Sequence, residues 1–228
     1  MPETNVAAEI TAFFGISSWS DDGADLGKVG KLAAAIDSAN FLNTEMAGCE
    51  RFNHAFDLLT AAMQKRTVEN GLTLEFGVFS GSTINHIAAQ DKGPIFGFDS
   101  FEGLPEDWRP SVPKDSFRTL AVPPVAANVT LVVGWFDRTL PGFVEQHREN
   151  IAFLHVDCDL YSSTKTVFEF LGDRIVPGTV IVFDEFFNYV GWRNHEFKAF
   201  REFIAERGLG CIYFGAVPSH QQVGVVIT

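Results

Sequence analysis

The sequence predicts an α/β fold in which helices cover both faces of a seven-stranded, mostly parallel, doubly wound sheet. From residue 72 onward, short apolar runs alternate with segments of helical periodicity, a pattern typical of parallel strands joined by crossover helices. The last two runs lack a helix between them and flank turn-like residues 217–220. They predict a C-terminal hairpin that adds one antiparallel strand. We expect a single domain over residues 1–228.

The first 70 residues are predicted to form a helical cap on this domain. Three segments carry apolar residues at three- and four-residue spacing, and glycines separate them. The predicted helices cover residues 7–14, 29–36 and 51–63. Residues 71–228 are then left to form the α/β core.

The core elements follow from the composition of each run. Runs rich in β-branched and aromatic residues between turn signals are typical of buried parallel strands. These strands are predicted at residues 72–76, 94–98, 129–133, 151–156, 179–183, 211–215 and 222–227. The helices are predicted at residues 83–90, 140–147, 162–171 and 195–207.

Composition limits the classes of function. A chain of 228 residues with 46% hydrophobic residues and 23 Phe can bury a large aromatic core. The net charge of −12 argues against nucleic acid and against an anionic membrane surface as partners. We see no signal peptide and no run of transmembrane length, and three unpaired cysteines (Cys49, Cys158 and Cys211) indicate a reducing cytoplasm. The sequence leaves a homo-oligomer open.

A glycine-containing loop follows the first core strand. In Leu-Glu-Phe-Gly-Val-Phe-Ser-Gly-Ser-Thr, which starts at Leu74, Gly77 permits a tight turn and Gly81 precedes a helix. A dinucleotide motif requires a third glycine, which is missing here. Glu75 would repel a pyrophosphate but suits a ligand that carries an amino group. The alternative is an ordinary strand-to-helix turn.

The next strand ends in Asp99-Ser100, about 20 residues after the glycine loop. An acid at this place is typical of a carboxylate that binds ribose hydroxyls. Asp99 could instead serve only as a helix cap. The glycine loop upstream favours the ribose role.

Four carboxylates follow the next two buried strands. Asp157 and Asp159 point the same way in an extended segment, and Asp184-Glu185 ends the following strand. Neighbouring strand ends would bring these acids together, and oxygen ligands suit a hard cation such as Mg²⁺. The alternative is a set of ordinary caps and loop acids in an acidic protein.

These motifs, together with Gly-Trp-Phe-Asp-Arg-Thr-Leu-Pro from Gly134, occur in an order that resembles the macrocin O-methyltransferase family. The resemblance covers about residues 70–190. It implies a Rossmann-like methyltransferase fold and an enzyme that transfers a methyl group from S-adenosylmethionine to a hydroxyl of a small acceptor. It also implies Mg²⁺ and an acceptor such as a sugar of a secondary metabolite.

The resemblance assigns roles to individual residues. Asp157, Asp184 and Glu185 would bind Mg²⁺, although the family usually has Asp at the last position, and Asp159 would be the general base. The cofactor would contact Glu75, Gly77, Gly81, Ser82, Thr83, Asp99, Ser100, Gly134, Trp135 and Asp157.

Other interpretations remain open. A nicotinamide-dependent oxidoreductase or a non-catalytic cofactor-binding protein could share this sheet. Catechol methyltransferases place a lysine where Leu160 stands, which disfavours a catechol acceptor. His155 is a reserve candidate for proton transfer, and Trp192 and His195 lie where an acceptor could dock or a helix could begin.

Overall fold

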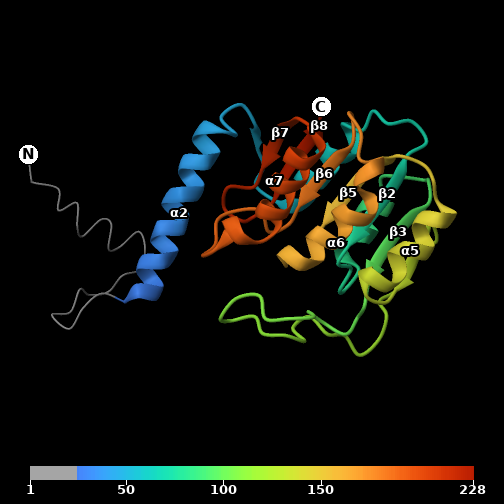
Figure 1. Ribbon diagram of the computed structural model, residues 1–228, viewed down its shortest axis with the longest axis horizontal. Coiled ribbons are helices and arrows are strands. Elements are labelled where there is room, and N and C mark those ends of the chain that lie inside the picture. The colour runs from blue at the N-terminus through green and yellow to red at the C-terminus, as the bar shows by residue number, and fades with distance from the viewer. Residues whose placement is uncertain (1–24) are drawn as a thin grey trace, which may run out of the picture.

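The computed structural model describes residues 25–228, so the helix expected at residues 7–14 lies outside the described part (Figure 1). One sheet forms the centre, with strand order β1-β7-β8-β6-β5-β2-β3-β4. Strand β8 runs antiparallel to both of its neighbours, and the other pairs are parallel. The strands are β1 (Glu50–Arg51), β2 (Leu72–Phe76), β3 (Ile95–Asp99), β4 (Val129–Val133), β5 (Ile151–Val156), β6 (Val180–Phe183), β7 (Cys211–Ala216) and β8 (Val223–Ile227).

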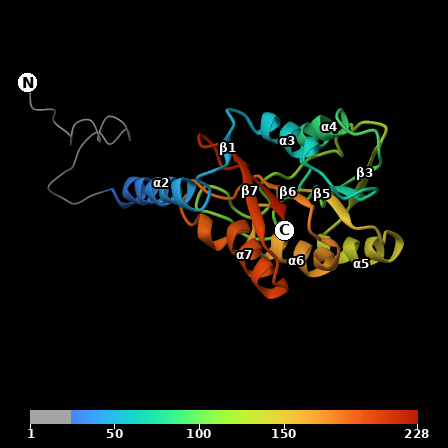
Figure 2. The same ribbon diagram turned by 90° about the horizontal axis from the view of Figure 1, so that it is seen from above.

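Helices cover both faces of the sheet. Helices α3 and α4 lie on one face and α5, α6 and α7 on the other (Figure 2). The helices are α2 (Leu26–Thr44), α3 (Ala55–Gln64), α4 (Ser82–Ala88), α5 (Phe136–Gln146), α6 (Tyr161–Leu171) and α7 (Glu196–Arg207), with short 3₁₀ turns at Gly172–Arg174 and Trp192–Asn194.

The predicted fold class is confirmed, with a correction to the number of strands. The sheet has eight strands instead of seven because Glu50–Arg51 pairs in parallel with β7. Both residues of β1 are exposed and charged, so no apolar run marks the strand in the sequence. The helix expected from residue 51 therefore begins only at Ala55.

Helix α5 also differs from its prediction. It begins at Phe136, four residues before the predicted start at residue 140, and it contains Pro141. Because proline lacks an N–H and clashes with the preceding turn, it is normally found in the first turn of a helix, which is where the predicted start at residue 140 places Pro141. The pattern alone does not reveal that a turn of helix precedes the proline.

Aromatic side chains fill the space between the sheet and the helices. Phe76 and Phe98 stack on neighbouring strands, with ring centroids 4.5 Å apart. Phe168 of α6 stacks on Phe203 of α7, also at 4.5 Å. Phe168 also contacts Phe183 of β6, with ring centroids 6.4 Å apart, so α6 packs against a strand whose carboxyl end carries acids described below.

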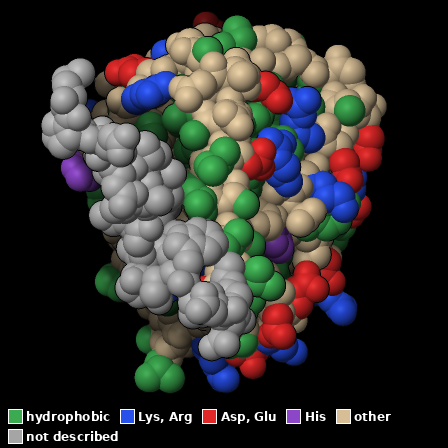
Figure 3. Space-filling model, turned by 90° about the vertical axis from the view of Figure 1, so that its left-hand side faces the viewer, with side chains coloured by type: hydrophobic (Ala, Val, Ile, Leu, Met, Phe, Trp, Pro, Cys, Tyr) green, Lys and Arg blue, Asp and Glu red, His purple; other side chains and the backbone are tan. Residues whose placement is uncertain are grey.

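Helix α2 extends away from the sheet and is attached near its C-terminal end (Figure 1). Phe41 packs against Trp192 with ring centroids 5.4 Å apart, and the backbone N–H of Asn188 donates to Ser38 Oγ at 2.9 Å. The other end of the helix is exposed, with Leu26 at 79%. On this side of the molecule, hydrophobic side chains lie among charged ones (Figure 3). None of the described helices is both long and apolar enough to cross a membrane.

The strand order identifies the edge at which a ligand can bind. Strand β2 lies between β3 and β5, so the chain leaves β2 on one side and returns through β5 on the other. Ligands of open α/β sheets bind outside the carboxyl ends of the strands at such a reversal. The glycine loop follows β2 and the acidic segment follows β5, so both motifs meet at this point.

Candidate active site

A cavity of about 450 Å³ opens at the carboxyl ends of the central strands. One side is formed by the glycine loop, the end of β3 and the start of α5, and the other by the segments that follow β5 and β6. The lining residues are Gly77, Phe79, Asp99, Ser100, Gly103, Leu104, Pro105, Phe117, Trp135, Phe136, Asp137, Asp157, Cys158, Asp159, Ser162, Ser163, Thr166 and Glu185.

Gly77 joins the two sides of this cavity. It has a φ of +90°, a region that favours glycine, and a Cβ at this position would lie 1.6 Å from the carbonyl oxygen of Asp157. The backbone N–H of Asp157 in turn donates to the carbonyl of Phe76 at 2.8 Å. The glycine predicted to permit a tight turn thus also accommodates the segment that carries the acids.

Asp99 stabilises the glycine loop and lines the cavity. Its Oδ2 accepts the backbone N–H groups of Val78 and Phe79, both at 2.8 Å, and its Oδ1 accepts that of Phe101 at 2.7 Å. The carboxylate therefore orients the loop while it faces the cavity, together with Ser100 and Trp135.

The other predicted cofactor residues lie outside the described cavity lining. Glu75 is fully buried, accepts a hydrogen bond from Thr83 Oγ1 at 3.1 Å and pairs with His155. Gly81, with a φ of +79°, is the N-cap residue of α4. The positions that have no contact with the cavity here are Glu75, Gly81, Ser82, Thr83 and Gly134.

The four predicted acids come together with a fifth. Burial and the charge of Asp184 raise the pKa values of Asp157 and Glu185 well above the ordinary range. The pKa of Glu196 is also raised well above its usual value, first by burial and then by the charges of Asp159 and Asp184. Carboxylates that destabilise one another in this way favour a bound cation.

Asp159 has an unusual backbone and an unusual environment. Its φ of +62° is in the left-handed region, which is uncommon for residues other than glycine and recurs at functional sites. Burial and the charge of Asp184 raise its pKa to about 7, although Arg109 and a hydrogen bond with Glu185 act in the opposite direction. The side chain is 6% exposed and lines the cavity.

Glu196 was not predicted as a site residue. Its fully buried carboxylate accepts the backbone N–H groups of Cys158 at 3.4 Å and Glu185 at 3.1 Å. It thereby joins the segments after β5 and β6. The position follows His195 at the start of a predicted helix, and no motif distinguishes it from an ordinary first-turn acid.

His155 has two different ring environments. Its Nδ1 lies 3.0 Å from Glu75 Oε2, and its Nε2 has no hydrogen-bond partner among the described residues. Burial lowers the pKa of His155, but the hydrogen bond and charge of Glu75 and the charge of Asp184 together raise it above the ordinary value.

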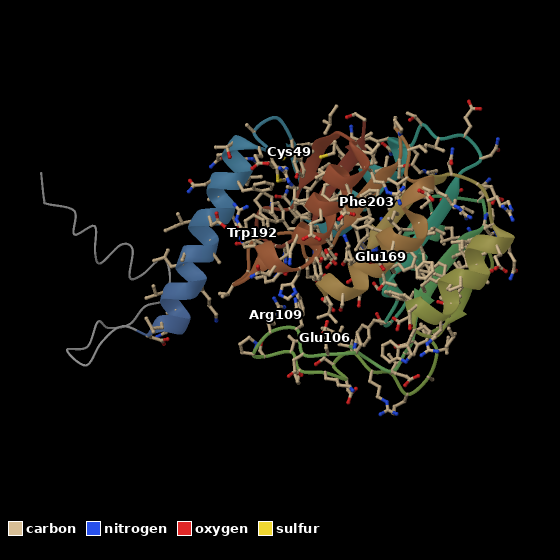
Figure 4. The ribbon with its side chains drawn as sticks, viewed as in Figure 1. Cys49, Glu106, Arg109, Glu169, Trp192 and Phe203 are labelled. Carbon is tan, nitrogen blue, oxygen red and sulfur yellow. The ribbon has the colours of Figure 1, made fainter. Side chains whose placement is uncertain are left out.

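The segment between β3 and β4 covers the acidic side of the cavity. Glu106 and Arg109 extend from it toward the helices (Figure 4), and Ser162 Oγ of α6 donates to Glu106. The Arg109 guanidinium lies 3.8 Å from the centre of the Trp108 ring and 5.3 Å from that of Tyr189. This cationic and aromatic group, which lies outside the described cavity lining, was not predicted from the sequence.

The two other candidates for acceptor contacts have separate surroundings. Trp192 is 2% exposed and packs on α2 through Phe41, so it anchors that helix. His195 lies beside Trp108 and Tyr189, with ring centroids 6.3 and 6.1 Å away.

The donor set fits a divalent cation. One ligating atom from each of His155, Asp157 and Asp184 lies within 4.8 Å of the others. Two buried atoms near this point, His155 Nε2 and Glu185 Oε2, have no partner among the described residues. Buried polar atoms of this kind require a ligand or water.

Comparisons with known proteins agree with the fold and the motifs. Residues 74–186, about half of the chain, match a family model described as a methyltransferase domain. A curated relative from Streptomyces olivaceus, 8-demethyl-8-(2,3-dimethoxy-alpha-L-rhamnosyl)-tetracenomycin-C 4'-O-methyltransferase, is 35% identical over 107 residues. That match covers 39% of this chain and 40% of the relative.

Two solved structures share the fold. The calicheamicin methyltransferase CalS11 matches with a TM-score of 0.61 and 21% identity, over 99% of this chain and 93% of that one. The O-methyltransferase NovP matches with a TM-score of 0.53 and 18% identity, over 75% of this chain and 78% of that one. The resemblance to sugar O-methyltransferases predicted from the motifs is confirmed, and the chain belongs to the methyltransferase family whose domain model matches residues 74–186.

Proposed function

We propose that this protein is an S-adenosylmethionine-dependent O-methyltransferase that acts on a hydroxyl of a small acceptor, such as a sugar of a secondary metabolite. One observation carries the proposal: a single cavity joins the glycine loop and Asp99 on one side to the acidic cluster on the other. The first side suits a nucleoside with an amino acid tail, and the second suits a hydroxyl that must lose a proton. The Streptomyces relative, named as an O-methyltransferase of a rhamnosyl group, supports a sugar acceptor.

On the cofactor side of the cavity, the residues would bind S-adenosylmethionine and orient its methyl group. Asp99 holds the glycine loop and presents a carboxylate toward the ribose position, while Trp135 lines the wall where the adenine is expected. Bound S-adenosylmethionine supplies a methyl group attached to a sulfonium sulfur. When the methyl group is transferred, the rest of the cofactor leaves as a neutral thioether. Positioning the acceptor oxygen in line with that methyl group accounts for much of the rate enhancement in such a reaction.

On the acceptor side, Asp159 takes the proton from the acceptor hydroxyl as its oxygen bonds to the methyl carbon. A pKa of about 7 leaves a large fraction of this carboxylate able to accept a proton at neutral pH. Asp157 and Asp184, with Glu185 beside them, would hold a divalent cation, which acidifies and orients a hydroxyl when bound. Burial of the cluster keeps water from competing for the methyl group.

Calorimetry with S-adenosylhomocysteine tests the cofactor assignment directly. We expect saturable binding at one site per chain, and no binding of NADH at the same concentrations. Saturable NADH binding without S-adenosylhomocysteine binding would establish the oxidoreductase alternative.

Transfer of a radiolabelled methyl group to a panel of rhamnosylated compounds tests the reaction. We expect Asp159→Asn to lower kcat by about 10² to 10⁴-fold, the usual contribution of a general base, with S-adenosylhomocysteine affinity maintained. Exposed Asp57→Asn on α3 is the matched control and should retain activity. Wild-type kcat in Asp159→Asn would refute the role of this carboxylate as the base.

A further inference from the structure

One ring nitrogen of His155 makes no hydrogen bond with the described residues. The side chain is fully buried between β2 and β6, and its Nε2 has no hydrogen-bond partner among the described residues. This atom lies 3.9 Å from Asp184 Oδ1, which is too long for a hydrogen bond. A buried nitrogen without a partner, directed at a carboxylate cluster, requires a ligand or water.

The other end of the ring is fixed. Nδ1 lies 3.0 Å from Glu75 Oε2, and this carboxylate oxygen accepts a hydrogen bond that the Nδ1–H donates. In the neutral ring this arrangement leaves the lone pair on Nε2, facing the cluster. Histidines that bind metals almost always donate their other ring N–H to a carboxylate or carbonyl in this manner.

The spacing leaves room for one ion. Two ligand atoms on an ion with bonds of about 2.1 Å are separated by roughly 3.0 Å when adjacent and 4.2 Å when opposite. The ligating atoms of His155, Asp157 and Asp184 all lie within 4.8 Å of one another. This limit is only slightly longer than the separation of two opposite ligands.

We propose that His155 Nε2 is a direct metal ligand beside Asp157 and Asp184, that Glu75 orients the ring, and that Glu185 lies outside the first coordination sphere. One imidazole and two carboxylates favour a divalent transition metal such as Mn²⁺ over Mg²⁺, which prefers oxygen ligands alone. The inference rests on the proposed function only for the presence of a cation at this site. It changes both the ligand set and the preferred metal that the sequence resemblance implies.

The position of Glu185 supports this exchange of ligands. Its side chain lines the cavity together with that of Asp159. It is not a member of the closely spaced group formed by His155, Asp157 and Asp184 among the described residues. Glu185 therefore lies on the side of the proposed base, Asp159. His155 takes its place as the third metal ligand.

The test uses the full chain loaded with Mn²⁺ and pulsed electron paramagnetic resonance. We expect coupling from a directly bound imidazole nitrogen in the wild type and in the control His54→Gln, which changes an exposed histidine. The coupling should be absent in His155→Gln. Mn²⁺ bound to the wild type without nitrogen coupling, or coupling that persists in His155→Gln, would overturn the proposal.

Calorimetry of the same proteins with Mn²⁺ and Mg²⁺ gives a second readout. His155→Gln should weaken Mn²⁺ binding at least about tenfold and weaken Mg²⁺ binding less, because the lost ligand is the nitrogen. Glu75→Gln should weaken Mn²⁺ binding by about 10-fold with the nitrogen coupling retained. An equal loss of both metals in His155→Gln, or no saturable Mn²⁺ binding to the wild type, would contradict the assignment.

Two provisions separate the possible failures. If His155→Gln does not fold, wild-type protein labelled with ¹⁵N-histidine decides the question, because a histidine ligand changes the nitrogen pattern and an unchanged pattern refutes it. S-adenosylhomocysteine binding is measured independently of the metal. Nitrogen coupling without S-adenosylhomocysteine binding would refute the proposed function alone.

Discussion

At the scale of single residues, Gly77 matters because two functional segments share its space. The carbonyl of Asp157 occupies the place that a Cβ at Gly77 would take. A side chain here must either displace the segment after β5 or strain a backbone with positive φ. Binding of the cofactor and placement of the acids are therefore coupled through one position without a side chain.

We predict that Gly77→Ala lowers the free energy of unfolding by about 2–4 kcal/mol, the range of overpacking combined with backbone strain. S-adenosylhomocysteine binding should weaken in the same variant. Urea denaturation and calorimetry measure the two effects. Gly142→Ala is the matched control because nothing lies within 4 Å of its Cβ position within α5, where alanine should stabilise by about 0.5–1 kcal/mol. Equal stability of the two variants would contradict this account.

Residues of the site differ in how far the sequence reveals them. Asp157 and Asp184 end buried apolar runs, and neighbouring parallel strands necessarily bring such ends together. Glu196 and Arg109 reach the same place from a helix and from a long segment whose path depends on tertiary packing. Their positions follow from no local pattern. The role of Glu75 toward His155 likewise depends on the register of β2 with β5.

At the scale of elements, Asp91 joins the segment after α4 to the end of α3 and to β2. Arg66 Nη1 pairs with its Oδ2, Thr73 Oγ1 donates to the same oxygen at 3.3 Å, and the N–H of Gly93 donates to Oδ1 at 2.9 Å. Burial raises the pKa of Asp91, but the Arg66 hydrogen bond and charge and the other donors lower it overall. The ionised form therefore stabilises the fold.

We predict that Asp91→Asn lowers the free energy of unfolding by about 1.5–3 kcal/mol at pH 7, as for hydrogen bonds to charged groups. Because the pKa is lower in the folded state, this stabilisation is present above the unfolded pKa of about 3.9 and is lost as the pH falls through the folded value. The difference from the wild type should therefore decrease below about pH 4. Denaturation between pH 3 and 7 measures it, with exposed Glu69→Gln as the control. A difference that is constant across this range would refute the linkage.

Elements were predictable where burial imposed a pattern. Strands β2 and β5 are buried at every position, and their apolar runs gave their bounds directly. Strand β1 has two exposed charged residues, and only the partner strand β7 makes it a strand. The hydrophobic pattern of a sequence reflects which side chains are buried. It therefore does not reveal a strand whose backbone pairs with a neighbour while its side chains stay exposed.

At the scale of the whole molecule, the acidic cluster opposes folding in the absence of a cation. Burial first, and then the charge of neighbouring carboxylates such as Asp184, raises the pKa values of Asp157, Asp159, Glu185 and Glu196. Each raised pKa means that the ionised carboxylate is less stable in the fold than in the unfolded chain. The acidic cluster therefore lowers the stability of the fold while it favours cation binding. Such a trade-off between stability and function is common at functional sites.

We predict that Asp184→Asn is at least as stable as the wild type in the presence of a chelator, with a gain of about 1 kcal/mol. The asparagine oxygen can still accept the hydrogen bond that Gln222 Nε2 donates at 3.1 Å. Added Mn²⁺ or Mg²⁺ should raise the melting temperature of the wild type and leave that of Asp184→Asn unchanged. Differential scanning calorimetry measures both, with exposed Glu149→Gln as the control. A variant that is less stable than the wild type under chelation would argue against repulsion as the dominant effect.

The attachment of α2 has a consequence for synthesis on the ribosome. Asp37 pairs with Arg193, and Glu45 pairs with Arg201, each across 156 positions of sequence. Among the described strands, β1 likewise pairs only with β7, which is near the C-terminal end of the sequence. The early segment therefore cannot complete its contacts until nearly the entire chain has emerged. Until then its aromatic surface around Phe41 is available to chaperones, so we expect the folding yield to depend on how quickly translation finishes.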